Sequence, residues 1–148
     1  MTDQSWRDIA RILIKRWEGC KLKAYKCPAD KWTIGYGETK GIREGMVWTQ
    51  QQAEDNLEER ITGWGKVFDA CLPMKCYAPR IKGVMVSFLH NLGETNFRNS
   101  TMLRRLRDGR TNEAADQLLR WVYAGGKKSQ GLVNRRTHER SVFLGGKL

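Results

Sequence analysis

The feature that most constrains the fold is the loss of helical periodicity between Lys21 and Gly45. In this stretch glycines alternate with aromatic and β-branched residues, in the sequence KLKAYKCPADKWTIGYGETKGIREG. Aromatic and β-branched residues favour strands, and glycines favour tight turns between them. We therefore predict a small antiparallel sheet that forms a lobe of its own, over about residues 19–46.

The sequence on both sides of this stretch predicts helices. Before it, a Ser-x-x-Asp capping signal begins at Ser5, and apolar residues recur at helical spacing as far as Glu18. After it, a Thr-x-x-Gln signal begins at Thr49, and the apolar run 81–92 predicts a central buried helix that ends at Gly93. Three more helices are expected over residues 101–108, 113–123 and 130–144.

The length of 148 residues is that of one domain, and such a domain buries roughly 70% of its unfolded surface. No internal repeat, low-complexity tract or long linker divides the sequence. We therefore predict a single α+β domain over residues 1–148 that is mainly α, with a small β lobe and a larger helical lobe.

The net charge of +11 is concentrated in the second half, because residues 61–148 hold 16 basic and 6 acidic side chains. A cationic surface attracts polyanions, so nucleic acid, anionic lipid and an anionic wall polymer are candidate partners. A solvated surface that keeps the protein in solution is the alternative. Charge alone does not choose among them.

The four cysteines lack the spacing of a metal site, because no CxxC motif occurs and both histidines are distant in sequence. We therefore expect no metal. No apolar stretch has the length of about 18 residues that spans a membrane, and no signal peptide is evident. We expect synthesis in the cytoplasm, where thiols stay reduced. Whether Cys71 and Cys76 form a disulfide after export is left open.

Glu18, at the expected end of the first helix, is a candidate general acid. Cleaving a glycosidic bond requires a proton donor, and a carboxyl serves near neutral pH only if it stays protonated. The negative end of the helix dipole and the neighbouring Trp17 both disfavour the charged form. Without further information, however, a glutamate at a frayed surface helix end is the favoured interpretation.

The motif around Glu18 favours the general acid over the glutamate at a frayed helix end. Glu-Gly is followed by Ala-Tyr and then by Trp-Thr-Ile-Gly-Tyr-Gly, and this pattern resembles the phage lysozymes of glycoside hydrolase family 24. The similarity covers nearly the whole chain, through WTQQQAE, VSFLHNLG, STML, AADQLLRWVYAGG and GLVNRRTHER. It implies a lysozyme-like fold with the active-site cleft between the two lobes.

The resemblance also implies a muramidase that hydrolyses the β-1,4 bond between N-acetylmuramic acid and N-acetylglucosamine in bacterial peptidoglycan, without a cofactor. The family's catalytic Glu, Asp or Cys, and Thr correspond to Glu18, Cys27 and Thr33. The middle residue is usually Asp. Cys27 either orients the attacking water as a thiolate, which we favour, or attacks the sugar itself. The first route inverts the anomeric carbon and the second retains it.

Two other polar residues near these motifs are not assigned to catalysis. Asp30 is the one acid between Glu18 and Thr33, but it follows Pro28 in a predicted turn. His90 lies within the central apolar run, and we expect it to be a hydrogen-bonded residue of the interior or of the cleft edge.

By resemblance, both walls of the cleft contribute to glycan binding. Tyr36 and Gly37 are expected on the β-lobe wall. The opposite wall is expected to contain five residues of the helical lobe, Trp121, Gly126, Gln130, Asn134 and Arg140. Each has a structural alternative, such as core packing for Trp121, a helix stop at Gly126 and an ion pair for Arg140.

We therefore predict a monomeric endolysin that acts on peptidoglycan and lyses the host at phage release, after a holin has permeabilised the membrane. An anionic outer-membrane surface is a further candidate partner for the basic C-terminal half, and no nucleic acid is expected. Two alternatives stay open. One is a lytic transglycosylase that uses Glu18 alone, and the other is a cationic protein that binds membranes or nucleic acid. The position of Thr33 favours hydrolysis.

Overall fold

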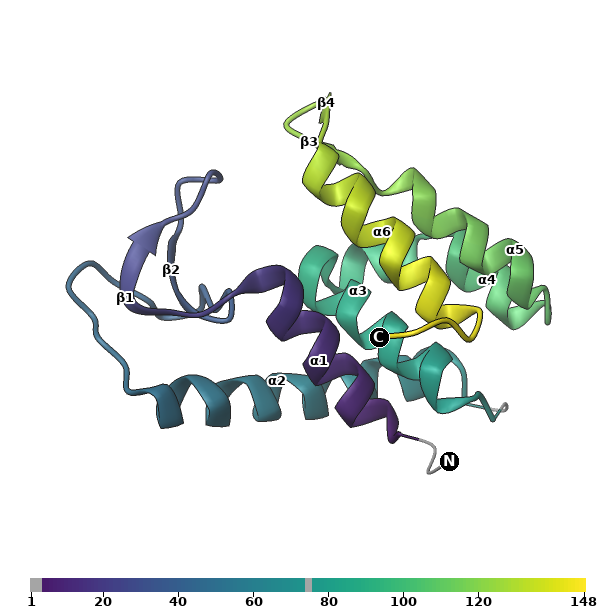
Figure 1. Ribbon diagram of the computed structural model, residues 1–148, viewed down its shortest axis with the longest axis horizontal. Coiled ribbons are helices and arrows are strands. Elements are labelled where there is room, and N and C mark those ends of the chain that lie inside the picture. Colours follow the sequence, from purple (N-terminus) through teal and green to yellow (C-terminus); the bar gives the residue numbers. More distant parts are fainter. Residues whose placement is uncertain (1–3, 74–75) are drawn as a thin grey trace.

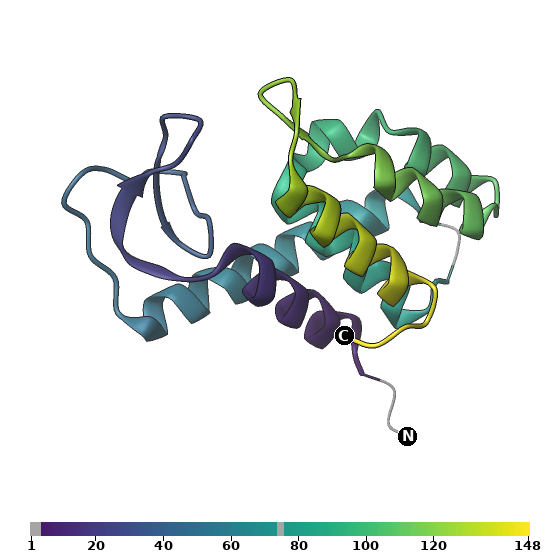
Figure 2. The same ribbon diagram turned by 45° about the horizontal axis from the view of Figure 1, so that its top comes forward.

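The computed structural model describes residues 4–73 and 76–148. It consists of a small lobe and a helical lobe, with a long helix running beneath both (Figures 1 and 2). The elements in chain order are α1 (Trp6–Glu18), β1 (Lys21–Lys26), β2 (Trp32–Gly35), α2 (Gln50–Cys71), α3 (Pro79–Arg98), α4 (Thr101–Arg107), α5 (Thr111–Gln117), the 3-10 helix η1 (Leu118–Arg120), β3 (Tyr123–Ala124), β4 (Lys127–Lys128) and α6 (Gln130–Phe143).

The small lobe is built on the antiparallel hairpin β1–β2, as its glycine-rich sequence predicts. Tyr25 pairs with Thr33 across the hairpin. The chain then returns along β1, where the backbone N–H of Trp48 donates to the Leu22 carbonyl at 2.8 Å. A two-stranded hairpin is only marginally stable by itself, so this lobe depends on its packing against the helices.

Helix α2 supplies that packing. It begins with the predicted capping box, in which the side chains of Thr49 and Gln52 each accept from the other's backbone N–H. Its apolar face is fully buried and shares a hydrophobic cluster with α1, α3 and the small lobe. The buried members of that cluster are Ala10, Ile14, Tyr36, Ala53, Leu57, Ile61 and Val86.

The larger hydrophobic core lies around α3, as predicted. Phe88 is fully buried and meets Trp121 edge-on, with 5.4 Å between ring centroids. The predicted helix end at Gly93 is instead a break within α3, because Gly93 has φ 85° and ψ 169° and the element continues to Arg98. Glycine adopts this left-handed φ at little cost, so Gly93 kinks the element.

The predicted helix over residues 113–123 is wrong in its second half. Helix α5 ends at Gln117, η1 follows, and the chain then forms the β3–β4 hairpin, which projects from the helical lobe beside the start of α6 (Figure 1). Gly125 and Gly126 have φ of 57° and 79°, the two left-handed residues that a two-residue hairpin turn requires. The aromatic and β-branched residues before the turn favour a strand.

The remaining helices follow the prediction. The side chains of Ser100 and Ser129 accept backbone N–H groups at the starts of α4 and α6. In the described parts of the chain, no helix is long and apolar enough to cross a membrane. All four cysteines fall within the described residues and are free thiols, with Cys71 buried and Cys76 exposed. The same residues contain no group of three or more ligands suited to a metal ion.

Candidate active site

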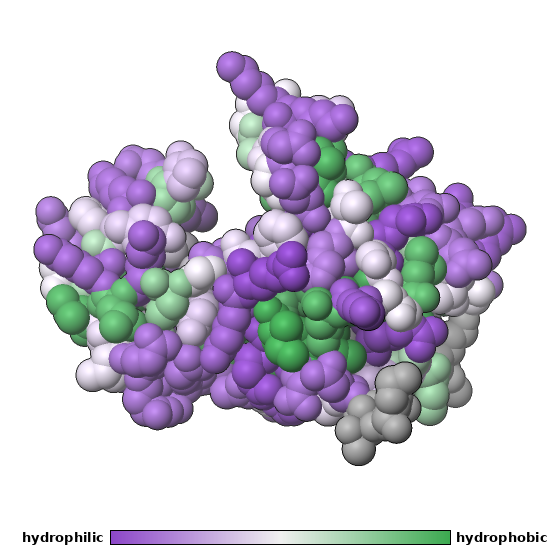
Figure 3. Space-filling model, viewed as in Figure 1, coloured by the Kyte–Doolittle hydropathy of each residue, from purple (hydrophilic) through white to green (hydrophobic). Residues whose placement is uncertain are grey.

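The surface is hollowed between the small lobe and the β3–β4 hairpin, as Figure 3 shows. Glu18 is the last residue of α1, where the chain leaves the helical lobe for the small lobe. Gly19, with φ 66°, ends the helix there. The Glu18 side chain is 22% exposed, so it is held at the junction of the lobes and stays accessible.

The Glu18 carboxylate is paired with a buried arginine. Arg135 Nη1 donates to Glu18 Oε1 at 2.7 Å, and the Arg135 side chain is only 5% exposed. This charge-assisted hydrogen bond fixes the orientation of the carboxylate. Arg135 is a site residue that the sequence analysis missed. The available signal was a pair of adjacent arginines at core-facing positions of the last helix.

The Tyr36–Gly37 backbone passes directly beside Glu18. A Cβ atom at Gly37 would lie 3.3 Å from Glu18 Oε2, and Gly37 has φ 90°, so glycine fits this close approach. His90 Nε2 lies 2.7 Å from the Tyr36 carbonyl oxygen. The Tyr36 side chain points away from Glu18 into the hydrophobic cluster around α2, and its hydroxyl donates to Glu54 Oε1 at 2.9 Å.

Cys27 and Thr33 meet at the end of the β1–β2 hairpin. The Cys27 backbone N–H and the Thr33 hydroxyl both donate to the Lys31 carbonyl, each at 2.9 Å. The Lys31 backbone N–H lowers the pKa of the Cys27 thiol below its usual value, and the Thr33 hydroxyl lowers it further. The hairpin therefore favours a thiolate at Cys27.

Tyr25 links these groups electrostatically. The pKa of its phenol is raised, first by burial and then by the negative charges of Glu18 and Cys27. Tyr25 also pairs with Thr33 across the hairpin. Tyr25, Cys27 and Thr33 thus lie on one hairpin of the small lobe, and Glu18 lies at the end of α1 where the chain enters that lobe.

Asp30 occupies the turn that the sequence predicts for it. It has φ 60°, and its side chain is 82% exposed and lies 3.2 Å from Lys26 Nζ. Asp30 N–H donates to the Cys27 carbonyl at 2.8 Å. The carboxylate is therefore a surface group at the hairpin tip.

His90 is an interior residue that connects α3 to the small lobe. Burial, followed by the charge of Arg60, lowers the pKa of His90 to about 4. The imidazole is consequently neutral at pH 7, and its Nε2–H donates to Tyr36. Its Nδ1 is buried and has no hydrogen-bond partner among the described residues.

The structure separates the residues predicted for the helical wall. Gly126 lies at the turn of the β3–β4 hairpin, and the Gln130 amide donates to Asn134 Oδ1 at 2.9 Å in the first turn of α6. Asn134 directly precedes Arg135, whose side chain reaches Glu18. Trp121 is half-buried against Phe88.

Arg140 lies apart from that group. It is ten residues after Gln130, which corresponds to about 15 Å along the helix, and it pairs with Asp116 at 2.7 Å. The ion pair is the structural alternative that the sequence left open for it. A contact of Arg140 with substrate stays a prediction.

Comparison with protein-family models matches the chain over residues 15–139 to the family described as phage lysozyme. Among curated proteins, it is 36% identical over 136 residues to an endolysin of Acyrthosiphon pisum secondary endosymbiont phage 1, covering 89% of this chain and 92% of that protein. It is 37% identical over 131 residues to a SAR-endolysin of Bacteriophage PS119, covering 88% and 78%.

Solved structures give the same result for the fold. The muramidase domain of SpmX from Asticaccaulis excentricus superposes with a TM-score of 0.84 at 30% identity, covering 97% of this chain and 99% of that one. An endolysin from Escherichia coli O157:H7 phage FAHEc1 superposes with a TM-score of 0.83 at 29% identity, covering 98% and 94%. The helical fold with a small antiparallel sheet is thus that of lysozyme-like muramidase domains.

Proposed function

Because the chain belongs to the phage lysozyme family, we infer that it is an endolysin, a glycoside hydrolase whose muramidase activity degrades bacterial peptidoglycan in host lysis. Its endolysin relatives and muramidase-like structure support this activity. The observation that supports the assignment of its site is the position of Glu18 at the end of α1, paired with buried Arg135 at 2.7 Å and lying against Gly37 of the small lobe.

Glu18 is the proposed general acid. Its protonated carboxyl donates a proton to the glycosidic oxygen, the bond between that oxygen and the anomeric carbon breaks, and a carboxylate remains. Arg135, at 2.7 Å, stabilises that carboxylate after the transfer. The Tyr36–Gly37 backbone limits the positions open to the carboxyl, because Gly37 lies against its second oxygen.

Cys27 and Thr33 are proposed to hold the attacking water. The Cys27 thiolate accepts a proton from the water as its oxygen bonds to the anomeric carbon, and the Thr33 hydroxyl orients the same molecule. The lowered pKa of Cys27 supports this role, since it increases the fraction of thiolate near neutral pH. Attack by water on the face opposite the leaving group inverts the anomeric carbon.

The products of peptidoglycan digestion test this mechanism. Wild type should release muropeptides with reducing ends, and NMR during the first turnovers should show the inverted anomer. Glu18→Gln, which keeps the shape of the side chain but removes the acid, should lose about 10³-fold in kcat. Cys76→Ser, at an exposed cysteine outside the cleft, is the matched control for Cys27→Ser and should keep wild-type activity.

Each other outcome identifies a different reaction. Retention of configuration together with a trapped sugar–sulfur adduct would make Cys27 the nucleophile. Anhydro ends would make the enzyme a lytic transglycosylase, in which the 6-hydroxyl of the muramic acid attacks instead of water. Wild-type activity in Glu18→Gln would overturn the site.

For substrate binding we propose contacts from the Tyr36–Gly37 backbone, Gly126, Gln130 and Asn134, because Gly37 lies beside Glu18 and the other three belong to the β3–β4 hairpin or the start of α6. Trp121 and Arg140 are proposed as supporting contacts. Glycan-fragment titration of Asn134→Ala, with the distant Asn99→Ala as control, should show weaker binding only for the first variant.

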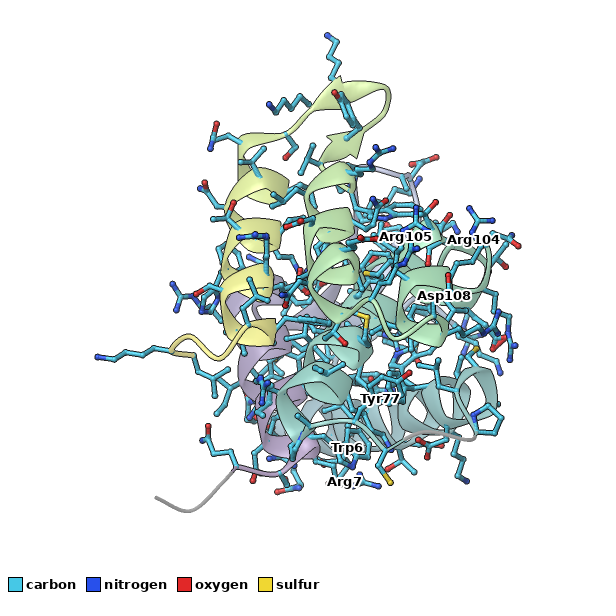
Figure 4. All side chains as sticks on the ribbon, turned by 90° about the vertical axis from the view of Figure 1, so that its right-hand side faces the viewer. Trp6, Arg7, Tyr77, Arg104, Arg105 and Asp108 are labelled. Atoms are coloured by element: carbon cyan, nitrogen blue, oxygen red, sulfur yellow. The ribbon has the colours of Figure 1, made fainter. Side chains whose placement is uncertain are left out.

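We further propose that the enzyme acts as a monomer and reaches peptidoglycan through a holin lesion, with the basic helical lobe contacting anionic outer-membrane lipid. Figure 4 shows Arg104 of α4 at the outer surface of that lobe, where its side chain is exposed. Salt-sensitive binding of Glu18→Gln to vesicles with anionic but not neutral headgroups would support the lipid contact. Lysis that needs holin co-expression would support the route, and light scattering measures the mass.

A further inference from the structure

Glu139 is a carboxylate that lies wholly inside the helical lobe. Its side chain is 0% exposed, and it sits on α6 one turn after two arginines. Its Oε1 accepts a hydrogen bond from Arg136 Nη1 and lies 3.7 Å from Arg135 Nε, while its Oε2 has no hydrogen-bond partner among the described residues. Burying a charge is costly unless it is compensated, so this carboxylate requires an explanation.

Arg135 connects Glu139 to the cleft. Its Nη1 contacts Glu18, its Nη2 lies 3.4 Å from the backbone and hydroxyl oxygens of Ser87, and its Nε faces Glu139. One guanidinium thus lies between two carboxylates, one accessible and one buried. A chain of alternating charges runs from the cleft into the core, in the order Glu18, Arg135, Glu139 and Arg136.

Arg136 fixes the buried end of this chain. Its Nε donates to the Trp121 carbonyl at 3.0 Å and its Nη2 donates to Asn91, and the guanidinium lies over the Phe88 ring. These contacts fix the Arg136 guanidinium, which in turn holds the Glu139 carboxylate in place. If the Glu139 side chain moved away, the buried Arg136 would be left as an unpaired charge in the core.

The contacts of Arg135 create a conflict for a general acid. A cation favours the ionised form of a carboxyl beside it, but a general acid must regain its proton in every cycle. A second anion on the same guanidinium offsets part of that cation's charge. We propose that Glu139 is a positioning residue that holds Arg135 against Glu18 and offsets its charge, so that Glu18 regains its proton near neutral pH. The inference rests on the proposed role of Glu18 as the acid.

The other charged or titratable groups that face Glu18 come from each neighbouring element. They are Arg135 and Arg136 of α6, His90 of α3, Arg60 of α2 and Tyr25 of β1. His90 is neutral near pH 7, Tyr25 is protonated, and Arg60 is 3.3 Å from Glu38. These groups do not change charge between pH 5 and 8, and protonation of the Cys27 thiolate acts on the acid limb of the profile, so the alkaline limb isolates the effect of Glu139.

The test is the pH profile of kcat/KM on purified peptidoglycan. Glu139→Gln removes the charge and keeps the shape, so the alkaline limb should move about one pH unit lower, while the acid limb stays in place. Glu139→Asp withdraws the charge from Arg135 and should move the limb less, in the same direction. Glu113→Gln, at a surface carboxylate that contacts Arg105 and Arg110, is the control and should not move it.

A structural role would give a different pattern. If Glu139→Gln lowers activity equally at all pH values, or if neither variant moves the limb, the inference is overturned. Circular dichroism identifies the folded variants, and Glu139→Asp decides the question should the Gln variant not fold. Loss of activity in Glu18→Gln with an unmoved limb in the Glu139 variants refutes this inference alone. Full activity in Glu18→Gln refutes the proposed site instead.

Discussion

The two sides of the cleft hold their functional groups by different means. On the small-lobe side, Cys27 and Thr33 are positioned by hydrogen bonds to one nearby carbonyl, that of Lys31, within a single hairpin. On the helical side, Arg135 reaches Glu18 across 117 positions of sequence and is backed by a fully buried Glu139. The first arrangement is local to one hairpin, and the second is tertiary and includes a fully buried carboxylate.

In the proposed mechanism, this difference separates the groups that hold the attacking water from those that set the protonation of the acid. Backbone N–H groups of a hairpin stabilise a thiolate without burying an ion. Controlling the protonation of a carboxyl beside a cation requires charges that solvent does not screen. Changes on the helical side should therefore alter stability and pH dependence, whereas changes on the hairpin side should alter turnover.

The largest expected effect comes from a substitution in the buried charges of the helical lobe. Arg136→Met removes the cation hydrogen-bonded to Glu139 and leaves the buried carboxylate only Arg135 at 3.7 Å, so the free energy of unfolding should fall by about 3 kcal/mol. Urea denaturation measures it. Arg98→Met removes a cation from the exposed pair with Glu94 and should cost less than about 0.5 kcal/mol. Equal losses of unfolding free energy in the two variants would show that the buried ion pairs stabilise the fold no more than the exposed pair does.

The next prediction concerns His90, which connects the two lobes. Its pKa is about 4 in the folded protein, below the ordinary 6.5, so the unfolded state takes up the proton first as the pH falls. The free energy of unfolding should therefore drop by up to about 3 kcal/mol between pH 6.5 and 4. His90→Gln lacks this titration, and its unfolding curve should be flatter over that range. Parallel curves would contradict the buried neutral imidazole.

On the hairpin side, Thr33→Val removes the hydroxyl and keeps the β-branched shape. Losing one hydrogen bond to the attacking water should lower kcat about 10- to 100-fold with little change in KM. Steady-state kinetics on soluble glycan chains separates the two constants. A rise in KM alone would assign Thr33 to substrate binding.

The smallest effect is expected at the hairpin tip. Asp30→Asn removes an exposed carboxylate whose ion pair with Lys26 contributes at most about 1 kcal/mol. Activity should stay within about twofold of wild type, because the carboxylate is outside the proposed site. A loss as large as that of Glu18→Gln would instead give Asp30 a role in the reaction.

Much of the fold could be predicted from sequence because its signals are local. The caps at Ser5 and Thr49 mark the starts of α1 and α2 where the sequence places them. The helix prediction over residues 113–123 was wrong because it also relied on local signals. A helical pattern and a hairpin signal overlap there, and local preference did not show which would prevail at Gln117.

The sequence by itself determined the spacing of Glu18, Cys27 and Thr33, the hairpin that joins the last two, and hence the family. These depend on neighbouring residues, whose backbone preferences and hydrogen bonds are set within a few positions. Only the tertiary structure decided that Arg135 contacts Glu18, that Glu139 lies behind Arg135 and that His90 holds the Tyr36 carbonyl. Those contacts form only when helices distant in sequence pack together and exclude water, and no local pattern specifies which buried charges will meet.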